Sequence, residues 1–210
     1  MKRPVSRRRW LSTAVAAATV VAAACGGVRY PKSYLLDLQT AAPQRRASPR
    51  VLGHLVVRDF QCPEYLCDGR IVYRPTTNEV GFYEYHRWAM SPRQMITDSI
   101  AASIRARGLF TSVTLREVDT DTALLFTGRI ERFEEVDRGE DVHALCALSG
   151  QLTDARTRSV IWSGSESATV PVAQRDVPGV VSSLAAATRA AVDALVASLE
   201  RQLIAAGSAQ

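Results

Sequence analysis

Alternation of apolar and polar residues runs through most of the chain after residue 33 and predicts a protein rich in β-strands. In the segment 51–60, for example, Leu55 and Val57 alternate with Val56 and Arg58. By this criterion we expect strands at 34–38, 51–60, 70–74, 79–88, 112–117, 124–136, 142–154 and 159–171. The last three are long, and turn residues at 137–140 and 154–158 separate them. They therefore predict an antiparallel meander.

The segment 92–107 shows helical spacing instead, together with start and stop signals. Pro92 suits the first position of a helix, and Gly108 supplies a C-terminal stop. Ser91 is expected to cap the helix, with Gln94 reaching back to the Ser91 amide in a capping box. The apolar stripe of this helix consists of Met95, Ile96, Ile100 and Ile104. We expect the stripe to lie on a sheet.

A second amphipathic helix is expected from Pro178 to about Gly207. The charged residues Arg189, Asp193 and Glu200 interrupt it, as does Arg201, which argues against a membrane-spanning helix. The resulting order is strands, helix, strands, helix. This order predicts a single α+β domain over residues 34–206, with two amphipathic helices packed on a mostly antiparallel sheet.

The formal charge of +5 comes from the N-terminus. No acidic residue precedes Asp37, and removing residues 1–24 leaves 21 basic and 21 acidic side chains. A neutral body argues against nucleic acid as a partner. The basic start and the apolar run 10–24 predict a secretory signal peptide over residues 1–24, because this run is shorter than the roughly 20 residues of a membrane helix. Both the general secretory route and the twin-arginine route stay open.

Cys25 follows three alanines at the end of the apolar run, an arrangement that resembles the lipobox of bacterial lipoproteins. The resemblance implies acylation of Cys25, and several acyl chains give a stable membrane anchor. The alternative is ordinary signal cleavage that releases a soluble protein. In the first case, residues 25–33 form a lipidated tether that reaches roughly 25 to 30 Å. By the same resemblance, Gly26 implies sorting to the outer membrane.

The remaining cysteines fit an exported chain. Cys62 and Cys67 are separated by four residues, and a small-loop disulfide between them is plausible outside the reducing cytosol. Cys146 lies in an apolar stretch and is expected to be a buried free thiol. A zinc site would need more ligands than His54, the only nearby histidine.

Several catalytic arrangements are excluded or unsupported. Since Lys2 and Lys32 are the only lysines, the domain has no phosphate loop of the G-x-x-x-x-G-K-[ST] type and no Schiff-base lysine in its core. It also lacks a G-x-S-x-G motif, and the three histidines show no metal-binding spacing. We therefore expect no enzyme, no metal and no cofactor. The acids Glu134, Glu135, Asp137, Glu140 and Asp141 are expected in a solvated hairpin turn.

The segment 71–89 is the densest in aromatic and basic residues. In a regular strand, Phe82, Glu84, His86 and Trp88 would share one face, with Tyr83, Tyr85 and Arg87 on the other. Tyr, Arg and Trp are enriched at interaction hot spots. The hypothesis is a partner-binding surface made of Tyr83, Tyr85, Arg87 and Trp88. The alternative is structural, with Trp88 covering the core under the 92–107 helix and Arg87 paired locally.

The ordered set of Cys25-Gly26-Gly27, the segments 34–38, 71–74 and 85–89, the helix 91–108 and Gly108-Leu109-Phe110 resembles the ABC-type transport auxiliary lipoprotein family. The likeness covers roughly residues 30 to 203. It implies a non-enzymatic outer-membrane lipoprotein that faces the periplasm. The Cys62 and Cys67 pair and Ala22 of the lipobox depart from the family pattern.

The resemblance also implies partners: an MCE-domain protein, and an inner-membrane permease and ATPase encoded separately. The expected role is to dock or accept phospholipid or another hydrophobic substrate at the outer membrane. An assembly or regulatory lipoprotein of another envelope machine is the alternative function. The sequence does not fix the oligomeric state, and a homo-oligomer stays open.

Overall fold

The computed structural model describes residues 30–38, 52–115 and 124–208. The chain divides into two units at Tyr30, and every helix and strand of the described part lies in the second unit, Pro31–Gln210. The signal segment 1–24, Cys25 and the tether up to residue 29 lie outside the described residues.

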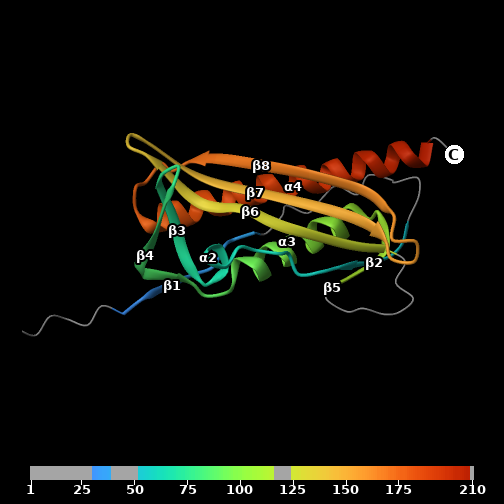
Figure 1. Ribbon diagram of the computed structural model, residues 1–210, viewed down its shortest axis with the longest axis horizontal. Coiled ribbons are helices and arrows are strands. Elements are labelled where there is room, and N and C mark those ends of the chain that lie inside the picture. The colour runs from blue at the N-terminus through green and yellow to red at the C-terminus, as the bar shows by residue number, and fades with distance from the viewer. Residues whose placement is uncertain (1–29, 39–51, 116–123, 209–210) are drawn as a thin grey trace, which may run out of the picture. The chain divides into compact units, whose positions relative to one another are not determined.

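Within the described ranges, the chain forms eight strands and three helices (Figure 1). They follow one another as β1 (Lys32–Tyr34), β2 (Leu52–Val57), α2 (Glu64–Cys67), β3 (Arg70–Thr76), β4 (Glu79–Trp88), α3 (Pro92–Arg107), β5 (Phe110–Leu115), β6 (Leu124–Arg138), β7 (Asp141–Asp154), β8 (Val160–Pro171) and α4 (Val177–Ser208). The expectation of two helices is wrong, because α2 has only 4 residues and is too short to show a helical spacing of apolar positions.

The long strand β6 organises the sheet. Along one edge it pairs with β7 in antiparallel orientation, and β7 pairs in the same way with β8. The antiparallel meander expected from the sequence is thereby confirmed. The other edge of β6 is shared by two parallel strands, with β2 beside its N-terminal part and β3 beside its C-terminal part.

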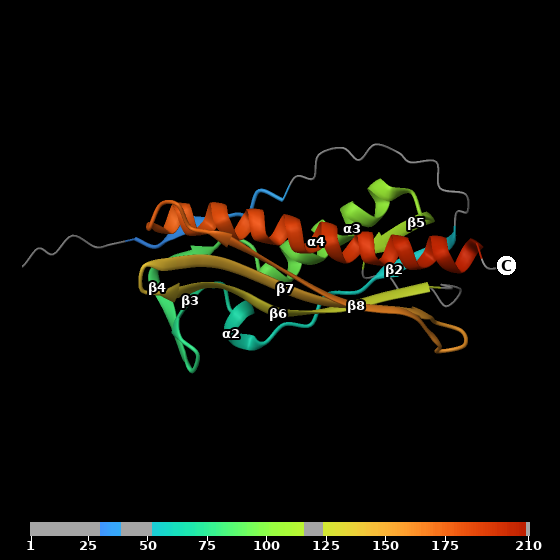
Figure 2. The same cartoon turned by 90° about the horizontal axis from the view of Figure 1, so that it is seen from above.

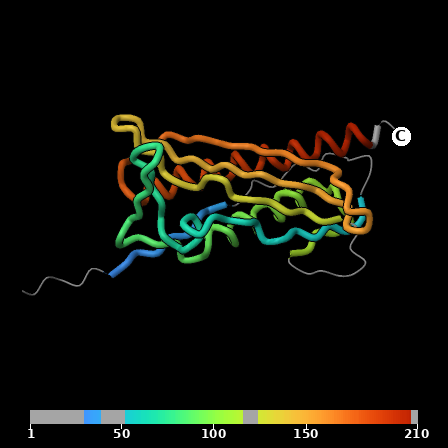
Figure 3. The backbone as a smooth tube through the Cα atoms, viewed as in Figure 1, coloured from blue at the N-terminus to red at the C-terminus, as the bar shows by residue number. Residues whose placement is uncertain are grey.

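The sheet is therefore mixed, and the expectation of a mostly antiparallel sheet is wrong. Four pairings are parallel, namely β1 with β4, β2 with β5, β2 with β6 and β3 with β6, against three antiparallel ones, among the residues that the structure describes. The cause is the path from β2 to β3. After β2 the chain continues along β6, where Gln61 bridges to Arg129, and β3 then resumes in the same direction (Figure 3).

Helix α3 has the predicted bounds. Pro92 occupies its start, and Gly108 ends it in the left-handed conformation with φ 65°, its N–H donating to the Arg105 carbonyl. The predicted capping box is wrong, because the Ser91 side chain makes no capping hydrogen bond. The Ser91 carbonyl instead accepts the Met95 N–H.

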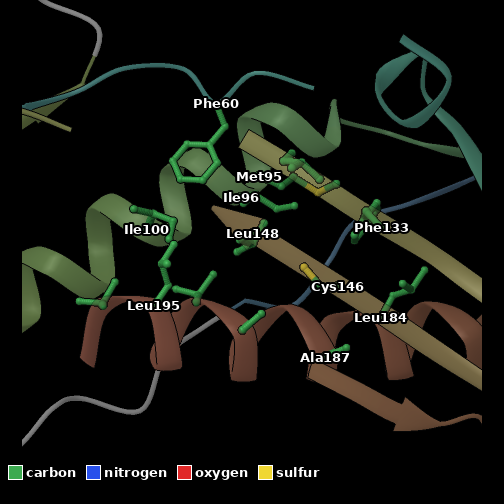
Figure 4. Close-up of a cluster of buried hydrophobic side chains, with 14 of the residues drawn as sticks. Phe60, Met95, Ile96, Ile100, Phe133, Cys146, Leu148, Leu184, Ala187 and Leu195 are labelled. Carbon is green, nitrogen blue, oxygen red and sulfur yellow. The ribbon is translucent and has the colours of Figure 1, made fainter. Parts of the chain in front are cut away.

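Helix α4 runs along one side of the strands, packing on β7 and β8 and beside α3 (Figure 2). Its length and hydropathy alone would allow a membrane span, but more than half of its most apolar stretch is buried in the fold. Leu184, Ala187 and Leu195 lie in the core with Ile96 and Ile100 of α3 (Figure 4). As the charged positions predicted, α4 is a core helix.

A row of glycines lets three aromatic rings lie close against the sheet. Gly128, Gly150 and Gly164 are cross-strand neighbours on β6, β7 and β8. A Cβ on Gly128 would lie 2.3 Å from the Phe60 ring, and one on Gly164 would lie 2.5 Å from the Trp162 ring. Phe126 stacks between the two aromatic residues, 6.1 Å from Phe60 and 5.9 Å from Trp162. This stack of aromatic rings extends the hydrophobic core to β8, the last strand in the chain.

Candidate functional site

The predicted contact residues lie on β4, whose pairing with β3 is interrupted. Arg70 lies opposite Arg87, but Val72 lies opposite Phe82, so β4 bulges between these positions. The bulge brings the Tyr83 and His86 rings into edge contact at 6.0 Å, although the two residues are three positions apart. The regular alternation expected from the sequence therefore fails across the bulge, and the four predicted residues separate into two pairs.

Two of the four residues are turned inward. Trp88 is only 6% exposed and packs on Phe133, with 5.4 Å between ring centroids. Tyr83 is half-buried beside Tyr73, and its hydroxyl donates a 2.6 Å hydrogen bond to Glu135 Oε2. Because their side chains are engaged in the fold, Trp88 and Tyr83 hold β4 against the core.

The other two residues face solvent. Tyr85 and Arg87 are exposed, and the register pairs Arg87 with Ser33 of β1. Leu35, just after β1, is 59% exposed, and Met90, just after β4, is 37% exposed. We call Leu35, Tyr85, Arg87 and Met90 the β4 edge surface. It joins apolar and aromatic side chains to a cation, the composition of an interaction hot spot.

Two arginines face each other across β3 and β4 beside this surface. Arg70 and Arg87 are cross-strand partners, and like charges in such positions repel. Asp68 offsets the repulsion through a 2.5 Å ion pair with Arg70. The Arg70 guanidinium also lies 3.6 Å from the centroid of the Phe82 ring. Arg70 is thus fixed in place, whereas the exposed Arg87 acts on Asp68 only through its charge.

Two neighbouring acids of β6, Glu134 and Glu135, are buried, although the sequence analysis expected them in a solvated turn. Glu134 is 0% exposed, and its carboxylate accepts hydrogen bonds from Arg74 Nε at 3.0 Å and from Arg132. The hydrogen bond to Glu134 outweighs burial and raises the pKa of the Arg74 guanidinium. The expectation was wrong because β6 extends to Arg138, beyond both acids, and because Arg74 lies 60 residues away in the chain.

Glu135 points to the opposite face of β6, where its carboxylate accepts the hydrogen bond from the Tyr83 hydroxyl. Burial raises its pKa, and the hydrogen bond from Tyr83 opposes this effect only in part. Burial and the bond to Glu135 together raise the pKa of Tyr83 as well. This pair links the inward side of β4 to the central strand.

The short helix α2 closes the gap between β2 and β3. Cys62 and Cys67 form a disulfide across it, with 6.1 Å between their Cα atoms. Leu66 is fully buried, and Tyr65 lies beside the Arg74 guanidinium. Cys146 of β7 is a buried free thiol whose pKa burial raises to about 12.

Two of the three histidines, His54 and His86, form side-chain hydrogen bonds between strands. The Tyr34 hydroxyl and His86 Nδ1 share a 2.9 Å hydrogen bond, which ties β1 to β4. His54 Nδ1 bonds to the Ser112 hydroxyl between β2 and β5. Within the described residues, no group of three potential metal ligands comes together.

A search of curated proteins found no match to the chain. Among solved structures, a Xanthomonas campestris protein of the DUF330 family has a TM-score of 0.70 at 18% identity, over 85% of this chain and 99% of that one. A hypothetical protein from Chlamydia trachomatis has a TM-score of 0.50 at 7% identity, over 74% and 99% of the two chains. A PelC dodecamer from Paraburkholderia phytofirmans has a TM-score of 0.46 at 14% identity, over 73% and 92%.

The first two likenesses show the fold. The sequence itself matches a family model, described as the ABC-type transport auxiliary lipoprotein component, over residues 34–199. That match spans the strands and helices from the end of β1 to the middle of α4, including the whole of β4. The chain therefore belongs to the ABC-type transport auxiliary lipoprotein family.

Proposed function

We propose that the protein is a lipid-anchored subunit that faces the periplasm from the outer membrane and assists an ABC transport system of the MCE type. The observation that carries the proposal is the family match over residues 34–199, preceded by Cys25 at the end of a signal-like segment. In this proposal residues 1–24 are removed, Cys25 is acylated, and the tether is shorter than the expected 25–33, because Lys32 and Ser33 belong to β1.

The division of labour follows from what the chain lacks. Without a lysine after position 32 it has no phosphate loop, so nucleotide hydrolysis belongs to a separate ATPase, and translocation to a separate permease. The subunit itself docks the MCE-domain protein, or accepts phospholipid or another hydrophobic molecule from it. No catalytic residue is assigned to this role.

The contact with the partner is assigned to the β4 edge surface. Tyr85 and Arg87 are the members of the predicted patch that reach solvent, and the exposed Leu35 and Met90 follow the paired ends of β1 and β4. A tether of about six extended residues would reach roughly 20 Å from the anchored Cys25 to the start of β1, which pairs with β4. The surface would therefore meet a partner that ends close to the outer membrane.

Cell fractionation with intact-mass measurement tests the anchor. The wild-type protein should be in the outer-membrane fraction with the mass of an acylated Cys25, and Cys25→Ser should move it to the soluble fraction. Cys146→Ala is the matched control, since that thiol is buried and should leave the location unchanged. A wild-type protein that is soluble and unacylated would contradict the proposal.

Crosslinking in the intact envelope tests the partner. Mass spectrometry of the crosslinked products should identify an MCE-domain protein. If instead the products contain the subunits of another envelope machine, the family's role here is assembly or regulation, and the transport proposal is wrong.

A further inference from the structure

Strand β8 is the longest open edge of the described sheet. It pairs with β7 on one side, and no described strand lies on its other side. Within the same part of the chain, β1 with 3 residues and β5 with 6 are the other open edges, against 12 residues in β8. Backbone N–H and C=O groups along the open side of β8 therefore form a template on which a further strand can pair.

Helix α4 forms a ledge beside this edge. It packs on β8, and its C-terminal part runs beyond the start of the strand (Figure 1). A groove of about 680 Å³ lies between the two elements and is lined by Val160, Ile161, Trp162, Ser163, Ser198, Arg201, Gln202 and Ala205. Hydroxyl, amide and guanidinium groups thus stand next to the open backbone of β8. This combination fits an extended polypeptide strand, whose main chain carries both donors and acceptors.

The edge has little of the protection that natural edge strands carry. Lysines, prolines and inward-pointing charges usually prevent further pairing. Strand β8 contains no lysine or arginine, its proline is the last residue, and Val160 and Ile161 at its start are 54% and 38% exposed. Glu166 is its only charged residue. Whether β8 can accept a further strand therefore depends on what Glu166 would meet.

Glu166 lies on the side of the sheet that α4 covers. It is the cross-strand neighbour of Leu148, which is 1% exposed in the core, so both side chains point to the same face. Trp162 points to this face as well, opposite Leu152. Among the described residues, neither Glu166 nor Arg201 of the groove forms an ion pair. One carboxylate and one guanidinium thus lie on the same side of the same edge without a partner in the described chain.

A two-fold axis would bring these two charges together. If β8 of a second copy pairs in antiparallel orientation about Gly164, Glu166 of each copy lies opposite Trp162 of the other. Trp162 and Arg201 line the same groove, so the carboxylate enters the groove that holds the guanidinium. Pairing about Glu166 itself would place two carboxylates opposite each other, which is destabilising. The charges therefore favour the register centred on Gly164.

We propose that two copies of the chain join through β8 into one continuous sheet, with a Glu166–Arg201 ion pair formed twice across the two-fold axis. Each groove then holds the C-terminal half of β8 from the other copy. The contact is isologous, because the same residues serve on both sides. The proposal does not depend on the partner contact at β4, so either can fail without the other.

Light scattering coupled to size-exclusion chromatography tests the oligomeric state. The purified full-length protein, kept in mild detergent, should have the protein mass of two chains. Dilution through the chromatography series gives the dissociation constant of the dimer. A wild-type protein that remains a single chain at all concentrations would overturn the proposal.

A charge exchange tests the ion pair. Glu166→Arg and Arg201→Glu should each weaken the dimer about 20-fold, because every dimer loses two ion pairs that contribute roughly five-fold each. The double variant Glu166→Arg/Arg201→Glu should restore the dissociation constant to within about 3-fold of wild type. Arg138→Glu, an equal charge change at the exposed end of β6, is the matched control and should leave the dimer intact. Failure of the double variant to regain the dimer, although circular dichroism shows it folded, would contradict the ion pair.

Crosslinking tests the register. Two differently tagged copies are produced together, one with Ser163→Cys and the other with Ser165→Cys, since these exposed positions are opposite each other when Gly164 is the centre. A short bismaleimide should join the two tags, whereas Ser163→Cys with Thr169→Cys, four positions further along β8, should not be joined. The native cysteines should not react, because Cys62 and Cys67 are bonded and Cys146 is buried. If Ser163→Cys crosslinks to another envelope protein and not to a second copy, the dimer proposal is wrong.

Discussion

The inward and outward sides of β4 use similar residue types for different purposes. On the inward side, Trp88 and Tyr83 pack on Phe133 and Tyr73, and Tyr83 bonds to a buried acid. On the outward side, Tyr85 and Arg87 reach solvent. The sequence places all four within six positions. The difference shows that residue type alone does not mark an interaction surface, because a bulge decides which side chains become available.

The largest effect is expected from the inward tryptophan. Trp88→Ala should lower the free energy of unfolding by about 3–5 kcal/mol, because it leaves a cavity next to Phe133. Tyr85→Ala on the same strand is the control and should cost less than about 1 kcal/mol. Urea denaturation measures both. Equal losses for the two variants would mean that β4 has no distinct inward side.

The next largest effect on stability is expected from the buried ion pair between Glu134 and Arg74. Glu134→Gln keeps the size of the side chain but leaves Arg74 and Arg132 without their anion, and should cost about 2–3 kcal/mol. The loss falls below that of a fully buried pair because Arg132 is partly exposed. Glu131→Gln, on the exposed part of the same strand, should cost less than about 1 kcal/mol by thermal unfolding. A neutral Glu134→Gln would show that the pair adds nothing to stability.

A smaller effect is expected from the Tyr83–Glu135 contact. Tyr83→Phe removes the donor to a largely buried carboxyl group and should cost about 1–2 kcal/mol at neutral pH. Tyr30→Phe is the control, since Tyr30 is 80% exposed, and should be neutral within about 0.5 kcal/mol.

The same contact predicts a pH dependence with a definite sign. Since burial raises the pKa of Glu135 in the folded state, the folded protein holds this proton more tightly than the unfolded chain. The stability from this group is full below the unfolded pKa of about 4.3 and declines as the pH rises through the folded pKa. Glu135→Gln should remove this decline in denaturation curves collected between acidic and neutral pH. An unchanged pH profile would contradict the assignment.

The smallest effect on stability is expected on the solvent-facing side of β4. Arg87→Ala should change the free energy of unfolding by less than about 0.5 kcal/mol, since Arg87 is exposed and Asp68 already pairs with Arg70. The same variant should reduce copurification of the proposed MCE-domain partner. If Arg87→Ala clearly lowers stability but leaves partner binding unchanged, Arg87 has a structural role and does not contact the partner.

Local signals in the sequence were sufficient for the parts of the fold that form from neighbouring residues. Pro92 and Gly108 define both ends of α3, and the turns around Gly139 and Asp154 define the β6 to β8 meander. The parallel pairing of β2 and β3 with β6 could not be predicted, because it joins residues some 60 to 70 positions apart through contacts that leave no local pattern.

The candidate site shows the same limit. The strand predicted at 79–88 is confirmed, but the bulge in β4 depends on its pairing with β3 and separates Tyr83 and Trp88 from Tyr85 and Arg87. The burial of Glu134 likewise depends on Arg74. One local signal was available, since Arg132 lies two residues before Glu134 on the same strand and therefore on the same face.

The central claim is that the outward side of β4 meets the transport partner. Site-specific photocrosslinking in living cells tests it most directly, with a photoreactive phenylalanine analogue at position 85 or, as the matched inward control, at position 83. The account predicts a crosslink to an MCE-domain protein from position 85 and none from position 83. Crosslinks from position 83 with none from position 85, or from neither position to any envelope protein, would contradict it.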